Sequence, residues 1–133
     1  MGYPVGDQQP SDLGALITLS VSPAGTYNSP DMSGKGASGV KVVTNITAQG
    51  GVAPTLQVNL QGKDQASGLY YNLLSSVALA ALGLTVLTLF PGAPVSANAV
   101  ASDMLPEIWR VQAIVAGTTT PTITATIGAS TAK

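Results

Sequence analysis

The sequence predicts an all-β protein, a single-domain β-sandwich or jelly roll of about seven to eight strands with an extended N-terminal arm. Three observations predict it. The composition combines 15 Gly and 9 Pro with much Thr, Ser and Val and little Lys or Glu, which favours strands joined by turns. Short segments alternate between apolar and polar residues, and turn-forming residues separate them. The length of 133 residues fits one domain.

The first segment, residues 1–38, is expected to be an arm and loop that contains one strand. The strand is predicted at 13–21, because Leu13, Ala15, Ile17, Leu19 and Val21 place apolar groups on one face. Its flanks are rich in Gly, Ser and Pro. No basic residue precedes a short apolar core near Met1, so a secretory signal is not expected. The β-sandwich core is expected to cover 39–133.

Two strands are predicted next, at 39–48 and 54–62, and the segment between them has the length of a hairpin loop. A further strand is predicted at 69–74, after a cluster of turn-forming residues. Because neighbouring strand residues point to opposite faces, one ring of the pair Tyr70 and Tyr71 is expected in the core and the other at the surface.

The last strands are predicted at 84–90, 107–116 and 122–127. Segments 39–62 and 107–128 share one order of features, namely a strand, a loop with Gly, a Pro-Thr pair and an alternating strand. Each proline is expected at the first position of a strand, where a missing N–H costs least. The similarity has two explanations, an internal duplication or two similar hairpins in one sandwich.

Residues 73–90 carry no charge and are numerous enough for a transmembrane helix, so a small membrane protein is one alternative. Ser, Gly and Thr interrupt the segment, its second half is rich in β-branched residues, and no Lys or Arg flanks it. We therefore expect a loop or short helical turn at 78–82, followed by a buried strand to which Leu84, Val86 and Thr88 belong.

The chain has no Cys and no His, which excludes thiol nucleophiles, disulfides, Ser-His-Asp triads and the usual zinc sites. Five basic residues against six acidic ones do not form a surface that neutralises phosphates, so nucleic-acid binding is not expected. The sequence thus predicts a protein that is not an enzyme, with no catalytic residue, cofactor or metal site.

The carboxylates are the remaining catalytic candidates. Asp64 lies beside Lys63, and Asp103 and Glu107 could form an acid–base or glycosidic pair, but turn sequences around them favour solvated side chains. Asp7, Asp12 and Asp31 lack the dense spacing of oxygen ligands in a calcium loop, so metal binding is not predicted.

Trp109 is expected to be the main core anchor, with Arg110 at the surface. The alternative is an exposed Trp109 that stacks on a sugar or a partner protein. Gly34, Gly36 and Gly39 do not have phosphate-loop spacing and indicate a flexible loop. Asn45-Ile46-Thr47 matches a glycosylation acceptor, but it lies within a predicted strand.

Segments 39–73 and 107–128 together resemble the small β-sandwich virion proteins of tailed bacteriophages, which are encoded near capsid genes. The resemblance covers roughly 39–128 and consists of motifs of moderate specificity: the strand entry Pro54-Thr55-Leu56, the exit Leu60-Gln61-Gly62 into a turn at Asp64, and the strand Trp109-Arg110-Val111 leading to Pro121-Thr122. The chain departs from the pattern at 1–38 and 73–90.

The resemblance implies a capsid decoration or cement protein that lies on the capsid surface of the virion, binds the major capsid protein and stabilises the head. It also implies a homo-oligomer, for which a trimer is expected, and residues 1–38 are the first candidate for contact with the capsid or a neighbouring copy. One alternative is a tail, head–tail connector or fibre component that binds a host glycan. Another is a small membrane protein spanning 73–90.

Overall fold

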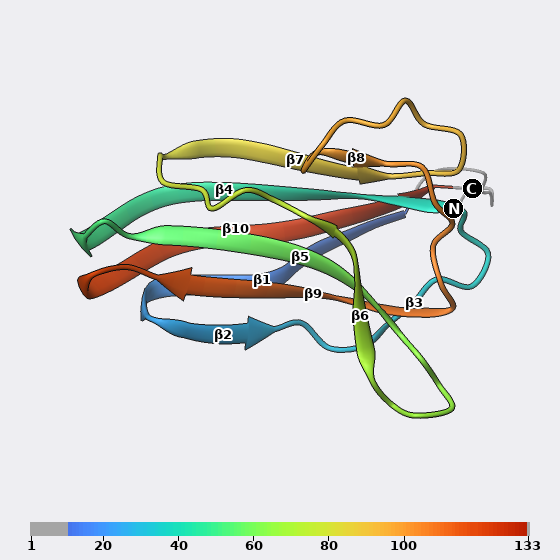
Figure 1. Ribbon diagram of the computed structural model, residues 1–133, viewed down its shortest axis with the longest axis horizontal. Helices are drawn as coiled ribbons and strands as arrows, with labels where there is room; N and C mark the ends of the chain where they lie inside the picture. The colour runs from blue at the N-terminus through green and yellow to red at the C-terminus, as the bar shows by residue number, and fades with distance from the viewer. Residues whose placement is uncertain (1–10, 133) are drawn as a thin grey trace, which may run out of the picture.

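The computed structural model describes residues 11–132, and these form two β-sheets packed face to face (Figure 1). The described residues contain ten strands and no helix. The prediction of an all-β, single-domain sandwich is therefore confirmed. The strands that the sequence pattern did not reveal are three short ones, β2 (Gly25–Asn28), β3 (Met32–Ser33) and β8 (Val100–Ala101).

Each sheet has its own strand order. Sheet A is ordered β1-β10-β4-β7-β8, with β1 at Ser11–Pro23, β10 at Thr119–Ala132, β4 at Gly39–Val52 and β7 at Gly83–Leu89. Sheet B is ordered β2-β9-β5-β6, with β9 at Ile108–Ala116, β5 at Thr55–Lys63 and β6 at Tyr70–Ser75, and β3 also pairs with β9. All pairs are antiparallel except β7 with β8.

The core lies between the two sheets and follows the two-residue period of the strands. In β9, Trp109, Val111, Ala113 and Val115 are buried, and in β10 Ile123, Ala125, Ile127 and Ala129 are buried. Trp109 is the largest fully buried side chain, so the prediction that it anchors the core is confirmed. Arg110, its neighbour, lies on the opposite, outer face of sheet B.

The expected hairpin between 39–48 and 54–62 is wrong, because β4 belongs to sheet A and β5 to sheet B. Segment 107–128 likewise passes from one sheet to the other. The two arches pair with each other instead, β4 with β10 and β5 with β9. At their tips, Gly51 has φ +82°, and a Cβ there would lie 2.2 Å from the carbonyl oxygen of Thr120.

The two prolines of these arches occupy different positions. Pro54 directly precedes β5, close to the expected start of the strand. Pro121 lies inside β10, where the register with β4 shifts between Thr119 and Thr122. The expectation that Pro121 begins a strand is therefore wrong, and a bulge accommodates the missing N–H instead.

Residues 73–90 contain the end of β6, a non-helical connection and β7. No helix of the described residues is long and apolar enough to cross a membrane. The expected buried face of β7 is the wrong one, since Leu84 and Val86 are 69% and 42% exposed while Leu87 and Leu89 are buried. Pairing of Leu87 with Val42 places it on the inner side of sheet A, and a shift of one residue inverts every side chain of a strand.

Neither tyrosine of β6 lies in the core, contrary to the expectation. Tyr70 is half-buried on the outer face of sheet B, and Tyr71 is 45% exposed. Tyr71 lies over Gly62, where a Cβ would be 2.7 Å from the ring atom Cζ. The core residue of β6 is Leu74.

Residues 11–33 belong to the two sheets through β1, β2 and β3. Ile17 and Leu19 are buried in the core, but Val21 is 66% exposed with φ +46°. Three shifts in the register of β1 with β10 interrupt the alternation that predicted a single apolar face. Residues 1–10 of the expected arm lie outside the described residues.

Candidate functional site

Four amide side chains form a row across the outer face of sheet B. They are Asn59 and Gln61 of β5, Asn72 of β6 and Gln112 of β9, and we call them the amide row. The Nδ2 of Asn59 donates to Oε1 of Gln112 at 3.1 Å, and the Nε2 of Gln61 donates to Oδ1 of Asn72 at 2.9 Å. Most of the amide groups therefore pair with one another across neighbouring strands. The Oδ1 of Asn59 has no hydrogen-bond partner among the described residues.

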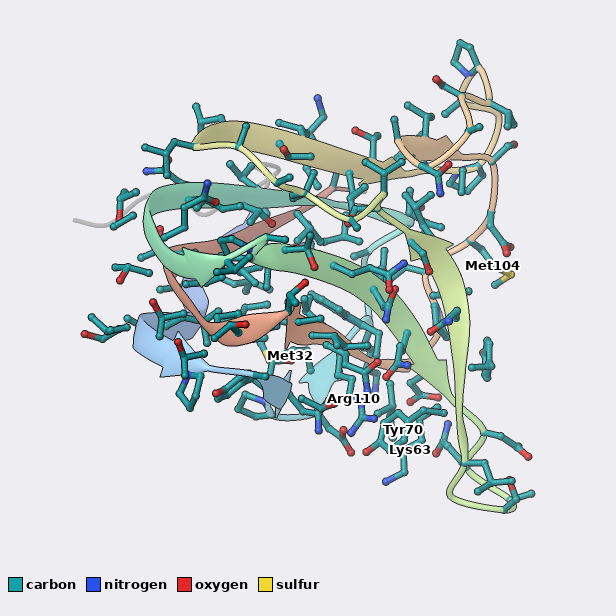
Figure 2. The ribbon with its side chains drawn as sticks, turned by 60° about the vertical axis from the view of Figure 1, so that its left-hand side comes forward. Met32, Lys63, Tyr70, Met104 and Arg110 are labelled. Atoms are coloured by element: carbon teal, nitrogen blue, oxygen red, sulfur yellow. The ribbon has the colours of Figure 1, made fainter. Side chains whose placement is uncertain are left out.

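A charged cluster continues the amide row toward the tip of the β5–β6 hairpin. We call Asp31, Lys63, Tyr70 and Arg110 the Tyr70 cluster, and Figure 2 shows the last three gathered on one side of the molecule. The guanidinium of Arg110 lies 3.5 Å from the centre of the Tyr70 ring, and its Nε donates to Oε1 of Gln61 at 2.8 Å. The hydroxyl of Tyr70 donates to Oδ1 of Asp31 at 2.7 Å.

Electrostatics in the Tyr70 cluster favour fixed charges. The hydrogen bond from Tyr70, and then that from Lys63, lowers the pKa of Asp31 below its ordinary 3.8. The same ion pair, 3.2 Å between Nζ and Oδ2, raises the pKa of Lys63. Both shifts hold the groups in the forms they already have at neutral pH. Neither group is tuned to exchange a proton near neutrality.

The other carboxylates are dispersed over exposed turns. The Ser67 hydroxyl, followed by the N–H of Ala66, lowers the pKa of Asp64, which therefore closes the β5–β6 turn as an anion. Asp103 and Glu107 are exposed, and Oδ1 of Asp103 accepts from the N–H of Met104. Within residues 11–132, no three acidic side chains gather in a way that could hold a metal ion. Asp7 lies outside the described residues, and Asp12 belongs to β1.

Complete burial of Trp109 removes it as a stacking platform for a ligand. The alternative of an exposed Trp109 is therefore wrong. Arg110 does make a cation–π contact, but with Tyr70 of the same chain. Sequence reasoning missed this cluster because its members come from a loop and three strands that only the fold brings together.

The glycines at 34–39 have structural roles. A Cβ on Gly34 would lie 2.2 Å from the carbonyl oxygen of Pro106, and one on Gly39 would lie 2.3 Å from that of Leu89. Gly36 has φ +80°. Close backbone approach and a left-handed turn therefore account for these glycines. The glycosylation-like Asn45 is half-buried within β4, opposite Leu84 of β7.

The outer face of sheet A around β4 and β7 has a different character, because its described side chains carry few charges. Val43 of β4 lies opposite Val86 of β7, and Leu84, opposite Asn45, lies two residue pairs further along on the same face. These three exposed side chains form what we call the Val43 patch. The nearest outward side chains of β4, β7 and β10 are Asn45, Thr88 and Thr126, and the charge at the end of the patch is that of Lys41.

An open hollow of about 470 Å³ lies at one end of sheet A, lined by the ends of β4, β7 and β10. Lys41 is the one ionisable side chain among its described lining residues. The hollow therefore offers apolar contact and no catalytic group.

Comparison with protein-family models, with curated proteins and with solved structures finds no significant match to this chain.

Proposed function

We propose that this chain is a non-enzymatic structural protein of a tailed-phage virion, a decoration protein that binds the major capsid protein and stabilises the head. The observation that carries the proposal is the Val43 patch. Exposed apolar side chains that gather on one face of a sheet indicate a surface made for another protein. A low-charge interface of this kind suits permanent contacts between the subunits of a shell.

The chemistry of the remaining surface supports a binding role. The described carboxylates are exposed or held as anions, and the Ser67 hydroxyl that donates to Asp64 lies in the exposed β5–β6 turn. A decoration protein needs only complementary surface, repeated at every lattice position. Attachment of many copies converts modest affinity at one site into strong reinforcement of the shell.

The glycan-binding tail or fibre component is the weaker candidate. Trp109 is buried, the Arg110 guanidinium covers the Tyr70 ring, and the amide row largely satisfies its own hydrogen bonds. A sugar would therefore have to displace existing contacts in order to bind the outer face of sheet B.

Co-sedimentation with empty heads, assembled from the major capsid protein of the same phage, tests the proposal. The wild-type chain should pellet with the heads, and Val43→Asp should lower its affinity at least tenfold, since it places a charge in the apolar patch. Thr26→Asp is the matched control, because Thr26 is exposed on β2 in sheet B. Equal binding by wild type and Val43→Asp, or no binding by wild type, would overturn the proposal.

A further inference from the structure

One edge of sheet A is open for pairing. Strand β7 pairs with β4 along one side, while on its other side β8 covers only Thr88 and Leu89. Among the described residues, no strand pairs with residues 83–87 on that second side. The N–H of Thr88 donates toward β8, to the carbonyl of Ala99 at 2.8 Å. Because backbone groups alternate along a strand, those of Leu84 and Val86 point to the same open side.

The other sheet edges carry features that oppose pairing. Strand β1 has three register shifts and two left-handed residues, Gly14 and Val21. On the edge of sheet B, β2 and β3 have four and two residues, with Pro30 between them. The register of β6 shifts opposite Leu60. Bulges, short strands and prolines are the usual protections of an exposed edge, and β7 has none of them.

Charge also distinguishes β7. Its seven residues, GLTVLTL, contain no ionisable side chain, and no charged residue occurs between Asp64 and Asp103. Two copies of this edge can therefore approach each other without like-charge repulsion. A second β7 is also the partner whose uncharged, apolar outer face matches that of the first β7. We infer that β7 pairs with β7 of a second copy and joins two sheets A into one continuous sheet.

The geometry fixes the register of this pairing. An antiparallel two-fold axis at Thr85 sets Leu84 opposite the partner's Val86, and both residues direct their backbone groups across the interface. These two equivalent pairs give four hydrogen bonds. Moving the axis toward Leu87 would drive each strand into β8 of the other copy, which already occupies the edge at Thr88. The two-fold contact closes on itself and produces a dimer, in place of the expected trimer.

The dimer is independent of the virion role, because it concerns copies of this chain alone.

At the two-fold axis, the two Thr85 residues form a non-hydrogen-bonded pair with a Cα separation of about 4.5 Å, which suits a disulfide. The chain has no cysteine, so any disulfide of a Thr85→Cys variant joins two molecules. Thr126→Cys, on the exposed surface of β10, is the matched control for random collision.

Two measurements test the dimer. Sedimentation equilibrium should show the wild type approaching twice the 13.3 kDa monomer mass as concentration rises. In dilute, mildly oxidising solution, Thr85→Cys should cross-link at least tenfold faster than Thr126→Cys. Monomer mass at all concentrations up to the solubility limit, a trimer mass, or equal cross-linking of the two cysteine variants would overturn the inference.

Val86→Pro separates edge pairing from the apolar face. It removes an N–H that points away from β4, so the bonds within sheet A remain, and we expect it to abolish the dimer. Val43→Lys changes the same outer face away from the edge and should remain dimeric. If Val86→Pro does not fold, Leu84→Lys with Val86→Lys replaces it, since both side chains are already exposed. A folded edge variant that remains dimeric would contradict the inference.

Discussion

The guanidinium of Arg110 lies 3.5 Å from the centre of the Tyr70 ring, although the two residues come from strands on either side of β5. The contact ties β9 to β6 across the outer face of sheet B. It also leaves Tyr70 oriented to donate its hydroxyl proton to Asp31. The cluster thus holds the loop before β3 against the β5–β6 hairpin.

We predict that Arg110→Lys lowers the free energy of unfolding by about 1 kcal/mol, because the planar stack and the bond to Gln61 are lost. In a Tyr70→Leu background, Arg110→Lys should lower the free energy of unfolding by measurably less. Urea unfolding of the four proteins in this double-mutant cycle measures the difference. A coupling energy of zero would show that the contact contributes nothing.

The lowered pKa of Asp31 predicts a contribution to stability that depends on pH. In the unfolded chain this carboxyl titrates near its ordinary 3.8, and in the folded protein Tyr70, first, and Lys63, second, lower its pKa. The contribution is therefore present above pH 3.8 and is lost as the pH falls through the lowered value.

Tyr70→Phe removes the larger cause of that shift, so the pKa of Asp31 should rise toward 3.8. Titration of the Asp31 carboxyl carbon by NMR measures the change. Tyr71→Phe is the control, because it makes the same chemical change on the neighbouring ring. An Asp31 pKa that is unchanged in Tyr70→Phe would contradict the assigned cause.

The orientation of β7 predicts that truncating two of its leucines changes the free energy of unfolding by very different amounts. Leu87→Ala should lower the free energy of unfolding by about 2–5 kcal/mol, since Leu87 is fully buried. Leu84→Ala should change it by less than about 0.5 kcal/mol in the monomer, because that side chain is exposed. Chemical denaturation at low protein concentration measures both. If Leu84→Ala lowers the free energy of unfolding more than Leu87→Ala does, the face of β7 that carries Leu84 lies in the core and the account is contradicted.

The contact between the two arch tips predicts a steric effect at Gly51. Gly51→Ala combines an unfavourable φ of +82° with a Cβ that would lie 2.2 Å from the Thr120 carbonyl oxygen. Gly36→Ala, at φ +80° with open space around it, isolates the backbone term. The midpoint temperature of thermal unfolding should therefore fall further in Gly51→Ala than in Gly36→Ala. Equal losses would mean that the tips separate at little cost.

Alternation of apolar and polar residues was sufficient to predict most long strands and the burial of Trp109. It could not assign strands to sheets, because an arch between sheets and a hairpin within one sheet have similar loop lengths. It also failed at β7, where Leu84 and Val86 on one face and Leu87 and Leu89 on the other are all apolar. Only pairing with Val42 and Val40 of β4 decides which face is inward.

The candidate surfaces were less accessible to sequence reasoning than the strands. The alternation of apolar and polar residues in β5 gives its outer face Thr55, Gln57, Asn59 and Gln61, but a single sequence does not identify their partners on β6 and β9. Asp31 and Lys63 are separated by 32 positions and meet because β3 and β5 both pair with β9. Long-range pairing of this kind leaves no local signal in a single sequence.

Location and copy number of the chain in purified virions test the proposed function most directly. Quantitative mass spectrometry together with cryo-electron microscopy would measure both. The account predicts one bound subunit or oligomer at each equivalent position of the capsid lattice, in contact with the major capsid protein. A few copies confined to one vertex or to the tail, or no copies in the virion, would contradict it.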